Sequence, residues 1–336
     1  MKREQYHRAA DASKRQILSK SVIKRLTAQT AGAPVFSEQA NRWLAEGQSR
    51  KRNPFRPWTV RTYSSQIENH LKPLIGQIPV QAIGNAVVKD VASQLATKGF
   101  SATTIELNIN IIKQIRASIL DQEGAQVYPY TWNSDFIDAP IVDKDKQKTP
   151  IASAQAVGDA LSKNCRGIGA LVALLTGSGL RIAEALALRI GVPDDGKGTV
   201  WIPQENRVIV RNQRNGKTFG PVKTKAGNRE IDLAEPLNNY LKKMVQPGPS
   251  IIFPLSEGRY RKALVKCGII GGFHSLRRFR VTHLRMNNVP DSLIHFWIGH
   301  EDESVTDRYT KVGSEIEARK IQTNRVGLGF KLPEAS

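Results

Sequence analysis

The amino-acid sequence predicts a mainly helical protein with a small antiparallel β-sheet, organised as a helical N-terminal domain and a mixed α/β domain. Apolar residues recur at helical spacing in several segments before residue 140 and again on both sides of a strand-like region. Short strand-like runs cluster between residues 199 and 233. The polar stretch DAPIVDKDKQKTP, which ends in proline, predicts a domain boundary near 140–150.

The first part of the chain predicts a helical bundle over residues 33–140. Before it, residues 1–32 are polar and basic with weak helical periodicity, and predict either an amphipathic arm or a mobile tail. In FSEQANRWLAEG, apolar residues repeat at helical spacing and Ser37 is the expected N-cap. In SATTIELNINIIKQIRASILDQEG, an isoleucine stripe runs from Ser101, the expected N-cap, to Gly124, the expected terminator.

The second domain is predicted over residues 147–322. It opens with the helical patterns SAQAVGDALSKN and IGALVALLTGSG, and the strands TVWIP, NRVIVR, PVKTK and REIDL follow. The turns NQRNGK and KAGNR between these strands suit hairpins. Helices resume at residue 235 and continue toward the end of the chain. A C-terminal tail is predicted over residues 323–336, and it includes the strand-like run VGLGFKL.

The charge of the chain is its most unusual property. Fifty Lys and Arg residues oppose thirty Asp and Glu residues, which gives a net charge of +20 and a pI near 10.1. Such an excess predicts a polyanionic partner, because each phosphate that a basic side chain neutralises releases condensed counterions. Ribosomal, RNA-binding and membrane-surface proteins are also basic, so charge alone favours nucleic acid without specifying its kind.

Other features argue against several classes of protein. The N-terminus lacks the apolar core of a secretory signal, and no apolar run is long enough to cross a bilayer. We therefore expect a cytoplasmic protein without a membrane partner. Cys165 and Cys267 lie far apart and predict buried free thiols. Neither cysteine is spaced with a histidine as zinc ligands are, so we expect no metal site and no cofactor.

One set of residues suits phosphodiester chemistry, which needs cations around phosphorus, an in-line nucleophile and a proton for the departing oxygen. Without a metal, arginine supplies the cation best through its bidentate fork. Arg181 follows TGSGL, where one helix is expected to end and the next to begin, and Glu184 lies on the same face at i+3. Alone, this pair fits either an anion clamp or a routine helix salt bridge.

Two further patterns supply the remaining chemistry. His274 and Arg277 are spaced i, i+3, so both side chains can reach one anion. His300 follows a glycine, and Tyr309 lies nine residues after it. Tyrosine is a poor nucleophile at its free pKa of about 10, but neighbouring cations favour its phenolate. Taken singly, HxxR is a weak signal, and a lone tyrosine in a polar helix is usually an exposed aromatic.

Taken together, the order and spacing of these residues resemble the tyrosine recombinase, or phage integrase, family. The matching motifs are TGSGLRIAE, a lysine-bearing hairpin, HSLR, and GH followed nine residues later by the tyrosine of RYT. The resemblance covers about residues 147–322 and implies the family's mixed α/β catalytic domain. The region 33–140 is similar, less specifically, to the family's helical core-binding domain.

The resemblance implies a site-specific DNA recombinase and gives each residue a role. Arg181 and Arg277 would clamp the scissile phosphate, and His274 and His300 would hydrogen-bond its oxygens, with His274 also taking part in proton transfer. Tyr309 would attack phosphorus and form a 3′-phosphotyrosyl intermediate. Since that linkage keeps the bond energy, rejoining needs neither ATP nor a metal.

The family's general acid is a lysine on a β-hairpin, and two residues compete for this role. Lys225, in TKAGNREIDL, matches best because a basic residue and an apolar strand follow at the expected offsets. Lys223 is the competitor. Glu184 corresponds to the family's acidic position behind the first arginine. The family often has histidine directly after HxLR, where this chain has Arg278, a position without a chemical role.

The partner implied by the resemblance is double-stranded DNA with a specific recombination site, bound by a homotetramer and accompanied by accessory DNA-bending proteins. A prokaryotic, phage or mobile-element origin is expected. In this family a C-terminal segment docks on a neighbouring protomer, and residues after about 313 are the candidates. The segment SRKRNPFRPWTVRTY mixes basic and aromatic residues and predicts either a DNA-backbone contact or a solvated linker. The candidate DNA-binding residues are Arg50, Lys51, Arg52, Arg56, Arg61 and Lys223.

Three competing interpretations remain. A DNA-binding protein that keeps the fold without the chemistry would not need the full set of catalytic residues. A type IB topoisomerase shares much of the chemistry, but the compact size and the separate helical region favour a recombinase. A metal-dependent nuclease would need clustered carboxylates. The only obvious pairs, Asp143 with Asp145 and Asp194 with Asp195, lie in polar loops typical of solvated turns.

Overall fold

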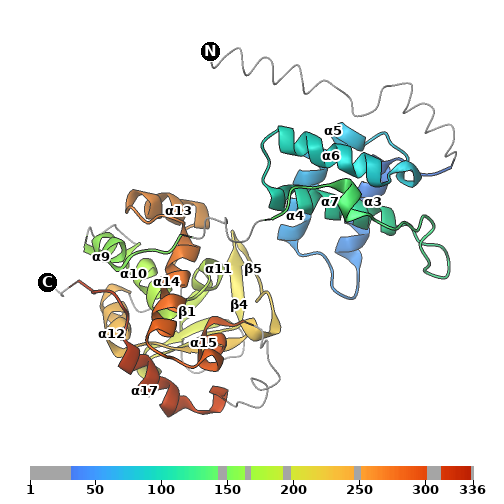
Figure 1. Ribbon diagram of the computed structural model, residues 1–336. Helices are drawn as coiled ribbons and strands as arrows, with labels where there is room; N and C mark the ends of the chain where they lie inside the picture. The colour runs from blue at the N-terminus through green and yellow to red at the C-terminus, as the bar shows by residue number, and fades with distance from the viewer. Residues whose placement is uncertain are drawn as a thin grey trace, which may run out of the picture. The chain divides into compact units, whose positions relative to one another are not determined.

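The chain forms two compact units, which divide at residues 147 and 148 (Figure 1). The computed structural model describes residues 32–142, 150–162, 168–191, 198–245, 251–300 and 312–333. Several predictions fall outside these residues: the arm at 1–32, apart from its last residue, together with Cys165, Tyr309 and both carboxylate pairs. The two units are described separately below.

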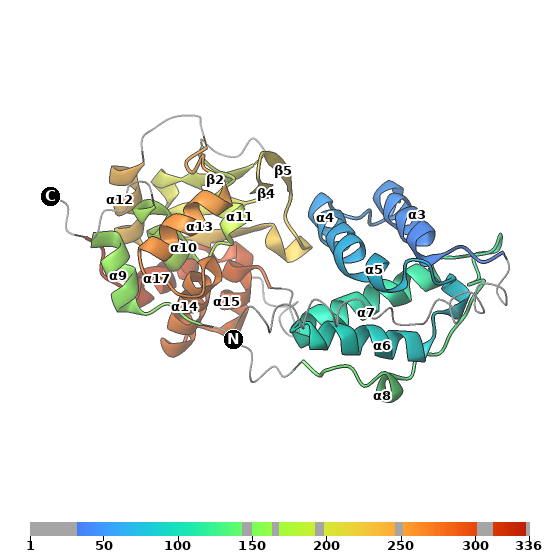
Figure 2. The same cartoon turned by 90° about the horizontal axis from the view of Figure 1, so that it is seen from above.

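Unit 1 is a helical bundle built around one apolar core. Helix α7 packs against both α3 and α6, and Figure 2 shows α6 and α7 side by side. The isoleucine stripe of α7 is buried, as its helical spacing predicts. The elements of unit 1 are α3 (Phe36–Ser49), α4 (Pro57–Gln66), the π-helical turn η1 (Ile67–Leu71), α5 (Lys72–Ile75), the 3₁₀ turn η2 (Val80–Ala82), α6 (Asn85–Thr97), α7 (Ala102–Ala117) and α8 (Ser134–Ile137).

The ends of these helices match the sequence predictions only in part. Ser101 caps α7 as predicted, since its hydroxyl accepts a hydrogen bond from the Thr104 N–H at 3.3 Å. The prediction for Ser37 is wrong, because α3 begins directly after Val35 and Ser37 lies inside its first turn. The prediction for Gly124 is also wrong. Helix α7 ends at Ala117, where the Ser118 hydroxyl donates to the Ile115 carbonyl at 2.7 Å.

Unit 2 packs helices against a small sheet. Helix α10 is buried along its whole length because it is apolar on every side, and it contacts α9, α12 and α14. This central helix fixes the position of the residues that follow its C-terminal end. The helices of unit 2 are α9 (Ala154–Ser162), α10 (Gly169–Ser178), α11 (Ile182–Ala185), α12 (Glu235–Met244), α13 (Glu257–Lys266), α14 (Phe273–Met286), α15 (Asp291–Ile298) and α17 (Ile316–Val326), with 3₁₀ turns η3 (Pro203–Glu205), η4 (Lys225–Gly227) and η5 (Val312–Ser314).

The main sheet of unit 2 has four strands in the order β1-β2-β3-β6. Its β2, β3 and β6 are antiparallel, as predicted, but β1 runs parallel to β2, so the sheet is mixed. Strands β4 and β5 form a separate antiparallel hairpin. The strands are β1 (Leu188–Ile190), β2 (Thr199–Ile202), β3 (Arg207–Val210), β4 (Asn212–Asn215), β5 (Thr218–Pro221) and β6 (Arg229–Asp232).

Three details of the strand prediction are wrong. The run PVKTK is not a strand, since β5 ends at Pro221, and KAGNR is not a hairpin turn. Instead, the 3₁₀ turn Lys225–Gly227 leads into β6, which pairs with β3 and not with β5. The apolar face of REIDL decides this pairing, because Ile231 lies opposite Val208 and both are buried. The run VGLGFKL contains no strand.

The last helix, α17, packs against β6 of its own unit. Its Arg319 is fully buried, with 0% of the residue exposed, and donates to the carboxylates of Asp232 at 2.9 Å and Glu230 at 2.8 Å. The guanidinium also lies over the Phe296 ring, 4.8 Å from its centroid. The indole N–H of Trp297 donates to Asp232 as well, at 2.8 Å. A buried cation with two carboxylates therefore fixes α17 to the sheet.

Cys267 differs from its predicted state. It is buried, as expected, but it forms a disulfide, so the prediction of a free thiol is wrong for this residue. The position of Cys267 in the sequence carries no signal for a disulfide, which depends on tertiary packing. None of the helices in the described ranges is long and apolar enough to span a lipid bilayer.

Candidate active site

Two glycines end the helices that border the candidate site. Gly179 follows α10 with φ +72°, and Gly299 follows α15 with φ +69°, a region that glycine enters without strain. A Cβ on Gly179 would meet the Ile298 side chain at 2.5 Å, so the ends of the two helices touch. The short turns at these glycines leave backbone carbonyls available to side chains of other helices.

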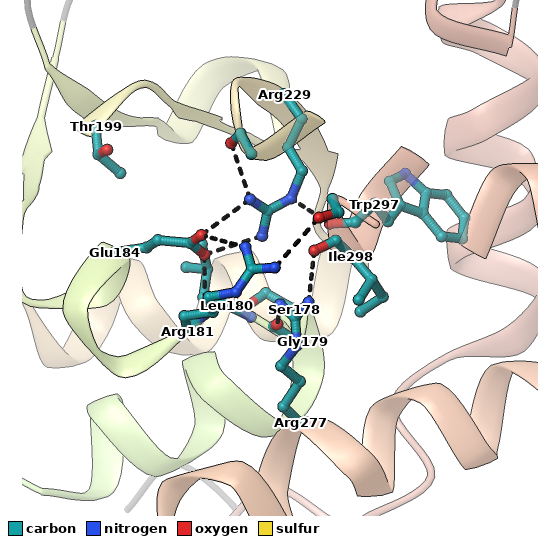
Figure 3. Close-up of polar contacts among 12 residues, drawn as sticks. Ser178, Gly179, Leu180, Arg181, Glu184, Thr199, Arg229, Arg277, Trp297 and Ile298 are labelled. Atoms are coloured by element: carbon teal, nitrogen blue, oxygen red, sulfur yellow. Dashed lines mark hydrogen bonds and ion pairs between the residues drawn. The ribbon is translucent and has the colours of Figure 1, made fainter. Parts of the chain in front are cut away.

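Arg277 joins the two helix ends. From the first turns of α14, its guanidinium donates to the carbonyls of Gly179 and Ile298, both at 2.6 Å (Figure 3). Only 7% of the residue is exposed. Burial, reinforced by repulsion from Arg181 and Arg229, lowers the pKa of Arg277 to about 9. Burial and the neighbouring cations destabilise the charged form of Arg277, so a nearby anion would stabilise it.

Arg181 lies at the N-terminus of α11 with extended backbone. Its guanidinium donates to Glu184 Oε1 at 2.8 Å and to the Gly299 carbonyl at 3.2 Å, and its backbone N–H donates to Glu184 Oε2 at 2.9 Å. The predicted i, i+3 pairing with Glu184 therefore exists, and it doubles as a helix cap. Arg181 and Arg277 contact the carbonyls of two consecutive residues, so the structure brings these two predicted arginines together.

His274 and His300 are both exposed and border the same cations. Burial, then Arg277, Arg278, Arg181 and Arg261 lower the pKa of His274 below its ordinary value of 6.5. The pKa of His300 is lowered by burial, Arg277, Arg181, His295 and Arg229, in that order. Arg181 and Arg277 of the predicted clamp thus lower the pKa of both imidazoles. Because both pKa values lie below 6.5, the neutral form predominates at pH 7. The N–H of a neutral imidazole can donate a hydrogen bond to a phosphate oxygen, and its other ring nitrogen can accept a proton.

Lys225 opens the 3₁₀ turn η4 and is exposed. This turn lies against the end of α15, because a Cβ on Gly299 would be 2.8 Å from the Ala226 carbonyl. Lys223 is exposed as well, and it lies between β5 and the turn. The turn that carries Lys225 therefore borders the residue before His300.

The predicted DNA-binding residues of unit 1 are all exposed. Arg50 lies over the Phe55 ring at 5.3 Å, and Arg61 lies over the exposed Trp58 ring at 5.7 Å. Such stacked guanidinium groups are ordered and remain available to phosphates. These residues are Arg50, Lys51 and Arg52 between α3 and α4, Arg56 at the start of α4, and Arg61 within it.

Sequence reasoning missed one residue of this site, Arg229 at the start of β6. It was noted only as a basic residue after Lys225, yet it is buried and ion-paired with Glu184. The available signal was that Arg229 alternates with Ile231 along the strand and so shares its buried face, where a charged group is rarely found without a partner. Within the described ranges, no three His, Cys, Asp or Glu side chains are placed to hold a metal ion.

Comparisons with known proteins identify the family that unit 2 resembles. The model of the phage integrase family matches residues 158–315, which include Arg181, Arg277 and both histidines. Unit 2 contains a phage integrase family domain. The resemblance to tyrosine recombinases that the motifs indicated is thereby confirmed. A search of curated proteins finds no significant match.

Solved structures of integrases share the fold of this chain. The Tn1549 transposon integrase, in complex with transposon right end DNA, is 16% identical with a TM-score of 0.61, over 87% of this chain and 99% of that chain. A lambda integrase dimer bound to a COC′ core site is 14% identical with a TM-score of 0.58, over 89% and 83%. A lambda integrase tetramer bound to a Holliday junction is 15% identical with a TM-score of 0.57, over 83% and 82%.

The two histidines give the stability of unit 2 a testable pH dependence. Because their pKa values are lowered in the folded state, the unfolded chain binds more protons between those values and 6.5. Stability should therefore be full above pH 6.5 and fall as the pH drops through that window. A His274→Gln/His300→Gln protein should lose part of this dependence in urea denaturation at pH 5 to 8.

Duplex DNA should raise both pKa values, because a phosphate between Arg181 and Arg277 cancels their repulsion. NMR titration of the imidazoles, with and without DNA, measures the shift. His283 is the internal control. Its pKa is also lowered by burial, but it contacts the Val326 carbonyl and lies outside the cationic cluster. Unchanged pKa values of His274 and His300 on binding would contradict a phosphate site here.

Proposed function

We propose that this chain is a site-specific DNA recombinase that cuts and rejoins duplex DNA through a 3′-phosphotyrosyl bond to Tyr309, without metal or ATP. The observation that carries the proposal is the pair of guanidinium groups at the end of α15. Arg277 and Arg181 donate to the carbonyls of Ile298 and Gly299, consecutive residues, from two different helices. Two cations held at neighbouring carbonyls suit the negative charge that develops in a phosphorane transition state.

The positions of the two histidines and the family motif support the remaining roles. His274 lies one turn before Arg277 on α14, and His300 directly follows Gly299, so both border the proposed phosphate. The Tyr309 oxygen forms a bond to phosphorus while the bond from phosphorus to the 5′ oxygen breaks. Lys225 gives its proton to that departing oxygen, and His274 assists removal of the phenol proton. Religation runs the same steps in reverse.

The other tyrosines of unit 2 support Tyr309 as the nucleophile. Tyr240 is half-buried and Tyr260 is buried, and burial raises the pKa of both phenols. A raised pKa makes a phenol a weaker nucleophile at neutral pH. Tyr309 is the third and last tyrosine after residue 147, and it follows His300 at the spacing of the family motif.

We further propose that the partner is duplex DNA bound by four protomers. The net charge of +20 and the exposed basic residues of unit 1 support binding to DNA. Recombination requires two duplexes to be cut in turn, which four active sites accomplish. The tetramer of lambda integrase on a Holliday junction offers a precedent for such an assembly. An intracellular setting in a prokaryote, phage or mobile element, with accessory DNA-bending proteins, fits this role.

A covalent trapping experiment tests the proposal. Bound duplexes are first selected from a random-sequence library, and the recovered site is then nicked close to each candidate cleavage position. Cleavage releases a short fragment that diffuses away, so religation fails and the adduct accumulates. We expect a protein–DNA species that survives detergent, with a blocked 3′ end and a free 5′-hydroxyl that a kinase can label. Tight binding without this adduct would favour a DNA-binding protein that retains the fold.

A further inference from the structure

Arg229 makes more contacts within the candidate site than any role in the proposed chemistry requires. Only 5% of the residue is exposed. Its guanidinium donates to both carboxylate oxygens of Glu184, at 3.1 and 2.9 Å, to the Trp297 carbonyl at 2.7 Å and to the Gly227 carbonyl at 3.0 Å (Figure 3). One side chain from β6 thus joins α11, α15 and η4.

Each of these partners lies next to a different part of the candidate site. Glu184 is shared with Arg181, which donates to the same carboxylate. The Trp297 carbonyl lies in the last turn of α15, two residues before Gly299. Gly227 closes the turn that Lys225 opens. Arg229 is therefore connected to Arg181 through a shared carboxylate, and to the turn that carries Lys225 through a hydrogen bond to the last residue of that turn.

The packing around Gly299 shows how closely Arg229 fits. A Cβ on Gly299 would lie 2.8 Å from the Arg229 Cδ and 3.0 Å from its Nε, nearer than side-chain atoms approach. Only glycine lets the backbone before His300 rest directly on this guanidinium stem. A shift of Arg229 would consequently displace the end of α15 that carries the acceptors of both clamp arginines.

The charges of the cluster favour the same interpretation. Arg229 engages both oxygens of Glu184, so the carboxylate is not neutralised by Arg181 alone. Arg229 also lowers the pKa of Arg277 and of His300 by repulsion. A third guanidinium beside Arg181 and Arg277 repels both of them, which lowers stability. A residue that served stability alone would not be expected to add this repulsion. The excess positive charge is balanced when a phosphate binds.

We propose that Arg229 is a positioning residue of the recombinase, which sets the geometry of Arg181, of the end of α15 and of the Lys225 turn at the same time. The Glu184–Arg229 pair orients the Arg181 guanidinium and leaves its charge available to the scissile phosphate. This role rests on the proposed function, because it acts through residues assigned there. Arg229 itself does not touch the DNA.

Arg229→Lys keeps the charge and removes the bidentate fork. We expect single-turnover cleavage at saturating protein to fall about 100-fold, as misplacement of catalytic groups commonly causes. DNA affinity should fall no further than Arg181→Ala lowers it. The matched control is Arg214→Lys, because Arg214 is also a buried arginine of unit 2, but it donates to the carbonyls of Phe253, Pro254 and Leu255, away from the cluster. That variant should cleave as wild type does.

A double-mutant cycle separates positioning from a purely structural role. The part of the Arg229 effect that acts through Arg181 is already lost in Arg181→Ala. Adding Arg229→Lys to that variant should therefore lower cleavage clearly less than the roughly 100-fold expected in the wild-type background. A structural role lowers only the folded fraction, so the two losses would multiply, and this result would overturn the proposal. Circular dichroism and the thermal midpoint establish the folded fraction of every variant. Arg229→Gln provides a second substitution if the lysine variant does not fold.

The same cycle on DNA affinity distinguishes failure of this inference from failure of the proposed function. Should wild type bind DNA without forming an adduct, the recombinase assignment fails, yet Arg181 can still contact phosphate. Arg181→Ala should then weaken affinity in the wild-type background and clearly less in the Arg229→Lys background. Equal effects in the two backgrounds would show that Arg229 does not position Arg181.

Discussion

A Tyr309→Phe protein should bind its DNA site with wild-type affinity and form no covalent adduct. The substitution removes one oxygen and leaves the ring, so contacts with the duplex are kept. Loss of the nucleophile should lower the cleavage rate by about 10⁴-fold or more, the scale seen when a catalytic nucleophile is removed. The measurement combines a gel-shift titration with the suicide duplex, resolved on a denaturing gel.

Tyr240→Phe is the matched control for that experiment. Tyr240 belongs to the same unit, is half-buried on α12 and has a raised pKa. Its substitution should leave the adduct yield unchanged. If Tyr309→Phe protein still trapped DNA, or if Tyr240→Phe protein failed to, the assignment of the nucleophile would be wrong. A peptide map of the wild-type adduct identifies the attached residue directly.

Glu184→Ala should produce the largest loss of stability among single substitutions at the site. Only 1% of the residue is exposed, and its carboxylate binds Arg181 and Arg229. Burial alone would raise the pKa of Glu184, but Arg229 and Arg181 together lower it. Removing the carboxylate leaves the buried Arg229 without a counter-ion, which costs about 3–5 kcal/mol of unfolding free energy. Urea denaturation at pH 7 measures this loss.

Two controls make the stability prediction specific. Glu257→Ala removes an exposed carboxylate that pairs with Arg261 on α13, and should cost less than about 1 kcal/mol. The pH dependence gives the second control. Because the folded pKa of Glu184 is lowered, its contribution is present above the ordinary value of 4.5 and is lost as pH falls through the folded value. A similar loss in both variants would contradict the network.

The candidate site was predictable from the sequence where its residues share one helix. Arg181 with Glu184 and His274 with Arg277 are three residues apart, and helical geometry alone places each pair on one face. Whether the two pairs meet depends on the ends of α10 and α15, which lie far apart in the sequence. Motif order supplied that information, because single pairs of this kind occur too often to be specific.

Arg229 could not be assigned from the sequence for a physical reason. Its three partners come from three elements, and each contact depends on how β6 aligns with the ends of α11 and α15. The pairing of β6 with β3 was itself missed, because a turn signal within KAGNR suggested a hairpin with the preceding segment. Local turn chemistry cannot reveal that two strands are separated by an inserted hairpin, here β4 and β5.

The contacts of β6 have a consequence for any exchange of C-terminal segments between protomers. Asp232 and Glu230 bind Arg319 of α17, while Arg229 at the other end of the same strand binds Glu184 of the candidate site. If α17 left its own subunit, the carboxylates of Asp232 and Glu230 on β6 would lose the guanidinium of Arg319. Asp232 is buried, so its carboxylate needs a cation. Protomers could therefore exchange this helix only if the copy from the partner placed its own arginine between the same two carboxylates.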